Sequence, residues 1–138
     1  IYGDYDVDGI TSTSVLYLAL KELGAENVNY YIPIRDEGYG LNNEALKKIK
    51  DSGADLIITV DCGITAFSEV EFANSINLPI IITDHHNLNG GRIPEALAVI
   101  NPKRKENSFS FEFLAGVGTI FMVVISLFER AGKKEVKA

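Results

Sequence analysis

The sequence is poor in cysteine and in long uncharged hydrophobic runs. Cys62 is its single cysteine, which excludes an internal disulfide framework and indicates a reducing compartment. The uncharged run at residues 113–128 is too short for a membrane-spanning helix, which needs about 20 apolar residues. No signal-peptide pattern opens the chain. We therefore expect a cytoplasmic protein.

Positive charge is also scarce. The 138 residues include 13 Lys and Arg against 19 Asp and Glu, which gives a formal net charge of -6. A protein that binds DNA through charge alone carries a basic patch, so this composition argues against that class. If many of the acidic residues surround a metal site, however, bound cations would change the local electrostatic field. Net charge alone therefore does not decide the partner.

Apolar runs alternate with helical patterns along the chain, and 46% of its residues are hydrophobic, enough for one packed domain. The predicted strands are residues 1–3, 28–32, 56–60, 79–83 and 98–100. The predicted helices are residues 10–23, 43–50 with a cap at Asn42 or Asn43, 66–76 and 113–131. This order predicts an α/β fold: a parallel, doubly wound sheet of about five strands with helices on both faces. Residues 101–110 form the one long polar loop.

Asp4, Asp6 and Asp8 stand at alternate positions after the first predicted strand. In an extended segment they would point the same way and repel one another, and a cation would relieve that repulsion. The spacing also fits the start of an EF-hand calcium loop, but the twelfth place, which needs Glu, is Val15. An aspartate-rich turn without a ligand remains the alternative for this motif alone.

Three further segments with polar chemistry follow predicted strands. They are residues 35–40, 61–63 and 84–86. Carboxyl ends of parallel strands meet at one edge of a sheet, where open α/β folds bind their ligands, so we expect all four segments to converge. Carboxylate and imidazole together suit Mn(II), Mg(II) or Zn(II), and the excess of carboxylates favours the first two.

The individual residues have alternative interpretations. Asp61 could cap the following helix, but its place beside other acidic loops favours a ligand that bridges two ions. His85 and His86 are adjacent and cannot easily face one metal, so we expect His85 as ligand and His86 as substrate contact. Cys62 is expected to be a small buried packing residue. Arg35, with Tyr39 and Gly40, is either a phosphate contact or a solvated arginine beside a turn, and we favour phosphate.

Five ordered motifs together resemble the DHH phosphoesterase superfamily, and within it the RecJ-type exonucleases that act on single-stranded DNA. Three are similar to motifs of the whole superfamily: residues 3–12, 60–64 and the Asp-His-His run at 84–86. Two, residues 32–41 and 114–118, are similar to RecJ-type segments rather than to those of small-nucleotide phosphodiesterases.

The resemblance implies two-metal hydrolysis of phosphodiester bonds in single-stranded DNA, from 5′ to 3′, in DNA repair and recombination, with Mn(II) or Mg(II) as the two ions. It implies that Asp6 and Asp61 hold one ion, that Asp8, Asp61 and His85 hold the other, and that Asp4 is an additional ligand. Asp61, His85 and His86 would be catalytic, with His86 on the scissile phosphate and Asp84 supporting a ligand. Further implied substrate contacts are Arg35, Tyr39, Gly40, Thr11 and Ser12, the last two through amide groups at the start of a helix.

One departure from the family pattern stands out. The family has another metal-binding aspartate in a motif beyond residues 114–118, which this chain lacks. We therefore expect residues 1–138 to be a DHH domain truncated at both ends, without a DHHA1-type domain and weak or inactive alone. The alternatives are a phosphodiesterase for oligoribonucleotides or cyclic dinucleotides, and an inactive DHH-like scaffold that binds nucleic acid. Protein partners from DNA repair are possible, and the sequence leaves the oligomeric state open.

Overall fold

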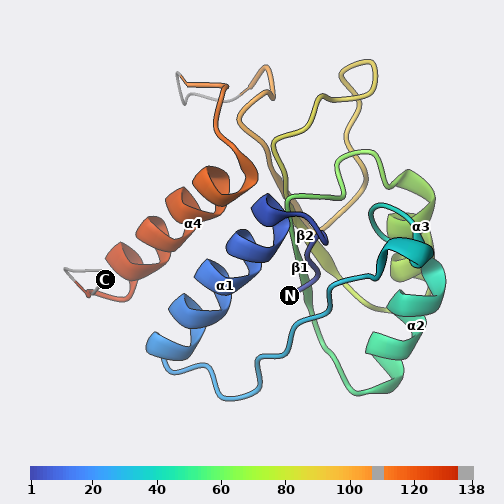
Figure 1. The fold of residues 1–138 in the computed structure, drawn as a ribbon, viewed down its shortest axis with the longest axis horizontal. Helices are drawn as coiled ribbons and strands as arrows, with labels where there is room; N and C mark the ends of the chain where they lie inside the picture. The colour runs from blue at the N-terminus through green and yellow to red at the C-terminus, as the bar shows by residue number, and fades with distance from the viewer. Residues whose placement is uncertain (107–110, 134–138) are drawn as a thin grey trace.

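The computed structural model describes residues 1–106 and 111–133, which form helices packed on a parallel sheet (Figure 1). The α-helices are α1 (Val7–Glu22), α2 (Asn43–Asp51), α3 (Phe67–Ser75) and α4 (Gly116–Arg130), and a short 3-10 helix, η1, spans Arg35–Glu37. The strands are β1 (Ile57–Val60), β2 (Ile80–Thr83) and β3 (Ala98–Ile100).

The three strands pair in the order β1-β2-β3, and both pairs are parallel. Tyr2 extends this sheet through parallel bridges to Thr59 on one side and to Tyr31 on the other. The segments at Tyr31 and Tyr2 and the three strands therefore lie side by side in the chain order 2-1-3-4-5. In this doubly wound order the sequence direction reverses beside the first segment, and such switch points open the ligand crevice of α/β sheets.

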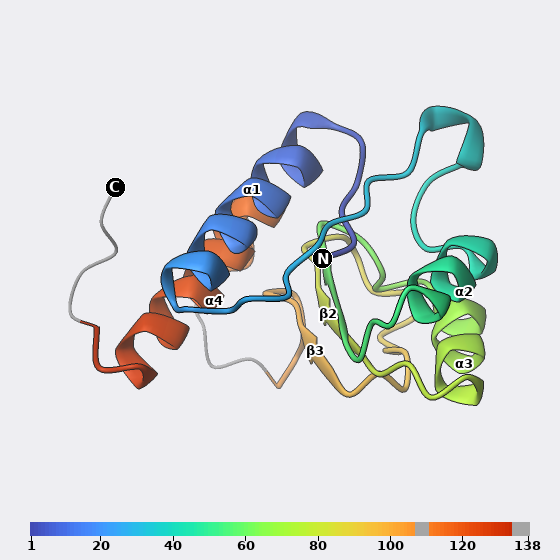
Figure 2. The same cartoon turned by 90° about the horizontal axis from the view of Figure 1, so that it is seen from below.

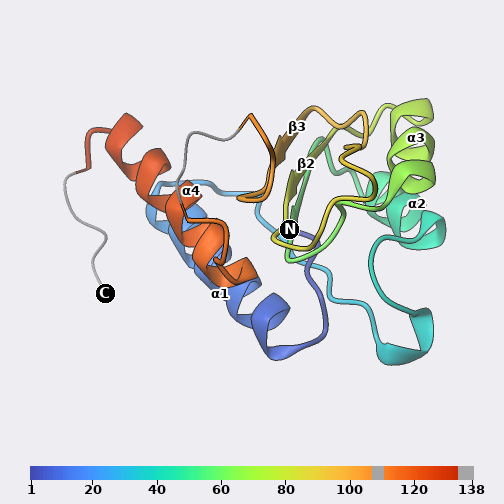
Figure 3. The ribbon, with the colours of Figure 1, turned by 90° about the horizontal axis from the view of Figure 1, so that it is seen from above.

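Helices cover both faces of the sheet. Figure 2 and Figure 3 show α1 and α4 side by side on one face, with α2 and α3 on the other. The alternation of side chains along a strand explains both cores: in β1, Ile57 packs with the α2 and α3 side, while Val60 packs with Leu16 of α1 and Ile120 of α4. The predicted fold class is confirmed.

Two of the five predicted strands are shorter than expected. Residues 1–3 and 28–32 contribute only the single bridges at Tyr2 and Tyr31, whereas residues 98–100 match β3. The structure describes the predicted polar loop only up to residue 106 and again from 111. Within the described ranges, no helix combines the length and the apolar character needed to cross a membrane.

Two helix starts differ from prediction because polar side chains cap them. Asp6 Oδ1 accepts a hydrogen bond from the Gly9 amide at 2.8 Å, so α1 begins at Val7 rather than at residue 10. The helix expected from residue 113 begins at Gly116 instead, where its first amides meet a side chain from α1. Of the two residues predicted as possible caps of α2, Asn42 is the cap, with its Oδ1 accepting from the Ala45 amide at 2.8 Å.

Candidate metal centre

Asp61 lies at the centre of an acidic cluster beside the switch point. It follows β1 directly, and its amide donates to the Thr83 carbonyl of β2 at 3.0 Å, which fixes the residue at the sheet edge. Its φ of 61° is in the left-handed region, where Asp and Asn are better tolerated than most side chains. The sequence predicted the position of Asp61 but not this backbone conformation.

The Asp61 carboxylate is buried without a hydrogen bond, and the nearest basic side chain is His85, whose Nε2 lies 3.1 Å from Oδ1. The exposed fraction of Asp61 is 1%, and neither carboxylate oxygen has a hydrogen-bond partner among the described residues. Desolvation, followed by the negative charges of Asp8 and Asp6, raises its pKa to about 8. A carboxylate in such surroundings either keeps a proton or requires a cation. This observation fits a metal ligand better than a helix cap.

Asp4 and Asp6 complete one group of oxygens around Asp61. One carboxylate oxygen from each of the three residues lies within 4.8 Å of the others, a spacing that one metal ion could span. Asp4 is buried and accepts from the Tyr5 amide at 2.7 Å, and desolvation raises its pKa. Asp6 thus has two uses: one oxygen caps α1, and the carboxylate also faces the cluster.

His85 and His86 approach Asp61 from the end of β2. His85 Nε2 lies 3.1 Å from Asp61 Oδ1 and 3.5 Å from Asp8 Oδ2. Asp61, His85 and His86 form the second group whose ligand atoms lie within 4.8 Å of one another. Asp61 is the member shared by the two groups. The geometry therefore allows either histidine to face an ion, a possibility that the sequence argument had reduced to His85.

Asp84 holds the two histidines in place. Its Oδ1 accepts from the backbone amides of His85 and His86 at 2.7 Å and 3.0 Å and lies 2.7 Å from His86 Nδ1. Its Oδ2 accepts from the Ile64 amide at 2.9 Å. Since an ionised carboxylate only accepts, the Nδ1 of His86 that faces Asp84 is the donor of this pair, and Nε2 is the ring nitrogen left to face the site.

Asp8 meets the amino end of α4. Its Oδ2 accepts from the Gly116 amide at 2.7 Å and its Oδ1 from the Val117 amide at 2.8 Å. These two amides would otherwise lack intrahelical partners, and the helix dipole favours a negative charge there. Asp8 therefore caps α4 while its Oδ2 faces His85. Each Asp8 oxygen retains a further lone pair, so the cap is compatible with metal binding. The expected role of Asp8 as a metal ligand stays a prediction.

Gly116 also approaches Asp61. A Cβ atom built on Gly116 would lie 2.5 Å from Asp61 Oδ1 and 2.7 Å from Asp61 Cγ, which no side chain could tolerate without movement. The sequence analysis had placed residues 114–118 in the last predicted helix and noted their resemblance to a family motif, without a role for Gly116 in the site. The signal that could have been used is a glycine at the start of a helix, which often marks a close approach of backbone.

The expected substrate contacts divide into two sets. The Tyr39 hydroxyl lies 3.2 Å from His86 Nδ1 and 3.4 Å from the Asp61 carbonyl, and desolvation with the charge of Asp84 raises its pKa above the ordinary range, so it remains a donor. The Arg35 guanidinium stacks over the Tyr5 ring at 5.4 Å, beside the first motif. The Gly40 carbonyl accepts from the Tyr2 hydroxyl at 3.0 Å and anchors this loop.

Thr11 and Ser12 lie elsewhere than expected. Because α1 begins at Val7, their amides are inside the helix rather than at its open end. The Thr11 hydroxyl donates to the Val7 carbonyl at 2.7 Å, and Ser12 is fully buried. The physical reason for expecting phosphate at their amides was therefore wrong. Cys62 is fully buried, as expected for a packing residue, and burial raises the pKa of its thiol.

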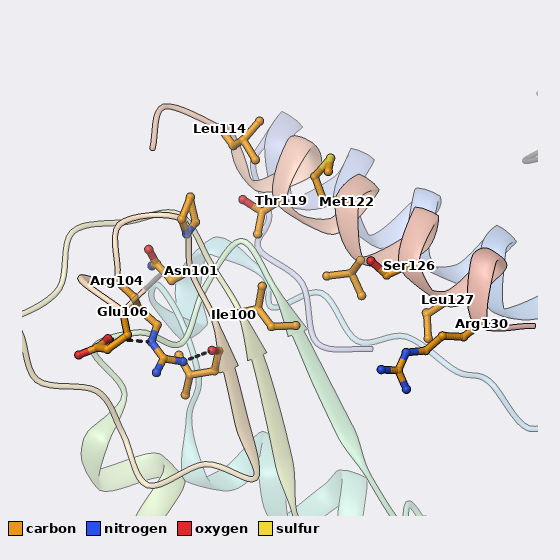
Figure 4. Close-up of a pocket in the computed structure, with 13 residues that line it drawn as sticks. Ile100, Asn101, Arg104, Glu106, Leu114, Thr119, Met122, Ser126, Leu127 and Arg130 are labelled. Carbon is orange, nitrogen blue, oxygen red and sulfur yellow. Dashed lines mark hydrogen bonds and ion pairs between the residues drawn. The ribbon is translucent and has the colours of Figure 1, made fainter. Parts of the chain in front are cut away.

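A separate cavity of about 620 Å³ lies between β3 and α4 (Figure 4). Ile100, Thr119 and Met122 line it, and Arg104 at its border donates to the Val99 carbonyl at 2.5 Å. None of the acidic or histidine residues of the cluster is among its lining residues. We therefore assign the chemistry of the site to the sheet edge rather than to this cavity.

Comparison with known proteins decides the family. The model of the DHH family, N-terminal domain, matches residues 1–138. The chain belongs to the DHH family. Its DHH domain is 48% identical over 128 residues to the single-stranded-DNA-specific exonuclease RecJ of Bacillus subtilis, a match that covers 92% of this chain and 16% of that protein. Identity to RecJ of Escherichia coli is 44% over 128 residues, covering 92% of this chain and 22% of that protein.

Solved structures give the same answer for the fold. A crystal structure of exonuclease RecJ bound to manganese matches this DHH domain with a TM-score of 0.82 and 36% identity, covering 95% of this chain and 33% of that one. RecJ of Thermus thermophilus in complex with Mn²⁺ matches with a TM-score of 0.72 and 33% identity, over 95% of this chain and 18% of that one. The chain spans about a fifth of the length of its curated relatives, 22% and 16% for the two named above.

Proposed function

We propose that this DHH domain is part of the catalytic core of a metal-dependent exonuclease that hydrolyses single-stranded DNA from its 5′ end. The observation that carries the proposal is the buried Asp61 carboxylate, whose two oxygens accept no hydrogen bond in the described part of the chain and lie among other carboxylates and beside His85. Likeness to two solved RecJ structures that contain manganese supports Mn(II) as the ion, with Mg(II) as the alternative.

Two ions are supported by the two groups that share Asp61. Asp4, Asp6 and Asp61 would hold one ion, and Asp61 with His85 the other, with Asp8 or His86 as its further ligand. When bound, such ions act as Lewis acids that activate water and stabilise the charge that builds up on phosphate oxygens. The protein contributes a rigid set of ligands, because Asp61, Asp84 and the first turn of α1 are all fixed by backbone hydrogen bonds.

Substrate would be positioned by residues at the rim of the cluster. Asp84 orients His86 so that its Nε2 is available to the phosphate or to an ion. The Tyr39 hydroxyl donates to the Asp61 carbonyl beside the same ring, and Arg35, stacked on Tyr5, offers a planar set of donors that suits a phosphate group. Because the relatives are several times longer, we propose that DNA hydrolysis requires further protein in addition to this domain.

A role in DNA repair and recombination, and contact with repair proteins, follow from the same likeness and are part of the proposal. A cytoplasmic location is supported by the single buried cysteine, which suits a reducing compartment.

A domain exchange tests the proposed function. In RecJ of Bacillus subtilis, the 128 matching residues would be replaced by those of this chain, and Mn(II)-dependent release of nucleotides would be followed from single-stranded and duplex DNA. We expect the chimera to degrade the single strand, and the same chimera with Asp61→Asn to be inactive. A folded chimera that leaves the single strand intact would refute the proposal.

A further inference from the structure

The amino end of α4 contacts two carboxylates of the acidic cluster in different ways. The amides of Gly116 and Val117 donate to the two oxygens of Asp8, as described above. The α-carbon of Gly116 faces the carboxylate of Asp61, so closely that a methyl group would overlap it. Asp8 and Asp61 come from α1 and from the end of β1, which means that α4 contacts two distant segments of the chain within one site.

The contact with Asp8 restricts that carboxylate. Two hydrogen bonds of 2.7 and 2.8 Å from consecutive amides of one helix fix both the position of the Asp8 oxygens and the plane of the group. The Oδ2 atom that accepts from Gly116 is also the atom 3.5 Å from His85 Nε2. The direction from which Asp8 faces the site is therefore determined by α4.

The contact with Asp61 restricts the second carboxylate by shape. Asp61 is 1% exposed, and Gly116 is the residue whose missing side chain leaves room for it. Gly118, two positions further along α4, is different: the three atoms nearest to a Cβ there all belong to the Leu114 side chain, the closest at 3.1 Å, and flexible side chains can move. Helix propensity favours alanine over glycine at both positions, so propensity does not explain Gly116.

We propose that Gly116 is a positioning residue of the metal centre: its amide orients Asp8, and its lack of a side chain allows Asp61 to face the ion. The inference rests on the proposed function, because it assigns Gly116 to the metal site proposed there. It predicts that one methyl group on Gly116 impairs metal binding through Asp61, whereas one on Gly118 does not.

The first experiment compares Gly116→Ala with Gly118→Ala in the 138-residue chain. Mn(II) affinity is measured by calorimetric titration, and circular dichroism establishes that each variant is folded. We expect Gly116→Ala to bind Mn(II) at least about tenfold more weakly than the parent chain, in the range found when the support of a metal ligand is removed. Gly118→Ala should bind as the parent does. Equal affinities in the two folded variants would overturn the proposal.

The second experiment remains decisive if Gly116→Ala does not fold. Asp61→Gly removes the carboxylate that the new methyl group would overlap, and glycine suits the positive φ at this position. Urea midpoints without metal are then measured for the parent, both single variants and the double variant. We expect Gly116→Ala to lower the midpoint in the parent and much less in the Asp61→Gly background. The same loss in both backgrounds, or a double variant that is unfolded while Asp61→Gly folds, would overturn the proposal.

The two experiments separate this inference from the proposed function. If the parent chain does not bind Mn(II), the proposed metal site fails. The urea midpoints are measured without metal, so they still report whether Gly116 makes room for Asp61 when no ion binds.

Discussion

Nδ1 of His86 lies 2.7 Å from Oδ1 of Asp84, a carboxylate with an exposed fraction of 1%. The same oxygen accepts from two backbone amides, and the other accepts from Ile64. Asp84 therefore links the end of β2 to the loop after β1 and orients the imidazole without facing the cluster itself. Partners of this kind fix which ring nitrogen of a histidine is available.

Asp84→Asn should weaken both the fold and the metal site. Asparagine accepts through one oxygen only, so a buried donor on one side loses its partner, at a cost of about 1 to 3 kcal/mol. We also expect Mn(II) affinity to fall by roughly 10- to 100-fold. Urea denaturation and calorimetric titration measure the two effects. Asp55→Asn is the control, because Asp55 is exposed. Equal behaviour of the two variants would show that Asp84 does not support the histidines.

Asp61→Asn should remove most Mn(II) binding. Asparagine preserves the size of the side chain and tolerates the positive φ of this position, so the change isolates the charge. We expect a loss greater than the roughly 100-fold at the top of the range for residues that only support a ligand. With a pKa of about 8, Asp61 still holds a proton at neutral pH, and metal binding must displace it.

That proton can be counted. Calorimetry at pH 7 in two buffers with different ionisation enthalpies gives the number of protons released per Mn(II) bound. The parent chain should release a proton from Asp61, and Mn(II) affinity should rise between pH 6 and 8. An affinity that does not change over this range would argue against Asp61 as a ligand.

Without metal, Asp61 should make the fold less stable as the pH rises. The pKa of Asp61 is raised from its ordinary value of 3.8 to about 8, so between these values the folded chain holds a proton that the unfolded chain has released. The contribution of Asp61 is thus most favourable below about pH 4, is lost progressively up to about pH 8, and is constant above.

Asp61→Asn should abolish this part of the pH dependence. The stability difference between variant and parent, measured by urea unfolding with a chelator, should grow from pH 5 to pH 8 in favour of the variant. Excess Mn(II) should then reverse the order at pH 8, because the ion stabilises only a chain that binds it. Two parallel pH profiles would mean that Asp61 is not the buried group responsible.

Arg35→Ala should weaken binding of single strands with a 5′-phosphate and leave Mn(II) affinity unchanged. Loss of a hydrogen bond to a charged group costs about 1.5 to 3 kcal/mol, which corresponds to roughly tenfold or more in kcat/KM. The assay uses the RecJ chimera with a long single strand and with a dinucleotide. Lys47→Ala removes a positive charge from the exposed face of α2 and is the control. If neither substrate responds to Arg35→Ala, Arg35 is a solvated surface charge.

The same assay separates the two enzymatic interpretations. An exonuclease should prefer the long strand, whereas a small-nucleotide phosphodiesterase should prefer the dinucleotide. If the chimera that retains Arg35 has a higher kcat/KM for the dinucleotide than for the long strand, the exonuclease interpretation is wrong.

Local sequence patterns predicted the parallel sheet and the clustering of polar side chains at its edge. Apolar strands ending in Asp, Arg or His are visible in a single sequence, and parallel strands bring such ends together. Asp61, His85 and Asp4 therefore lie together as expected. The start of α1 was misplaced because Asp6 was interpreted only as a ligand, although an aspartate three residues before Gly9 is also an ordinary helix cap.

Contacts between distant segments could not be predicted in this way. Asp8 and Gly116 are separated by 108 positions, and no periodicity in either segment reports on the other. The positive φ of Asp61 depends on its hydrogen bond to β2, and the stacking of Arg35 on Tyr5 depends on the path of a loop. These features depend on tertiary packing, which a local reading of the sequence does not contain.

The hydrogen bond between Asp8 and Gly116 also affects when the metal site forms during synthesis and folding of the chain. The chain is synthesised from its amino end, so Asp8 is made more than a hundred residues before the amides of α4 that restrain it. Closing a loop of that length is entropically costly and belongs to the slow contacts of folding. The ligand set would therefore reach its final geometry late in folding, when α4 docks on α1, and a nascent chain that ends before α4 would expose its carboxylates without organising them.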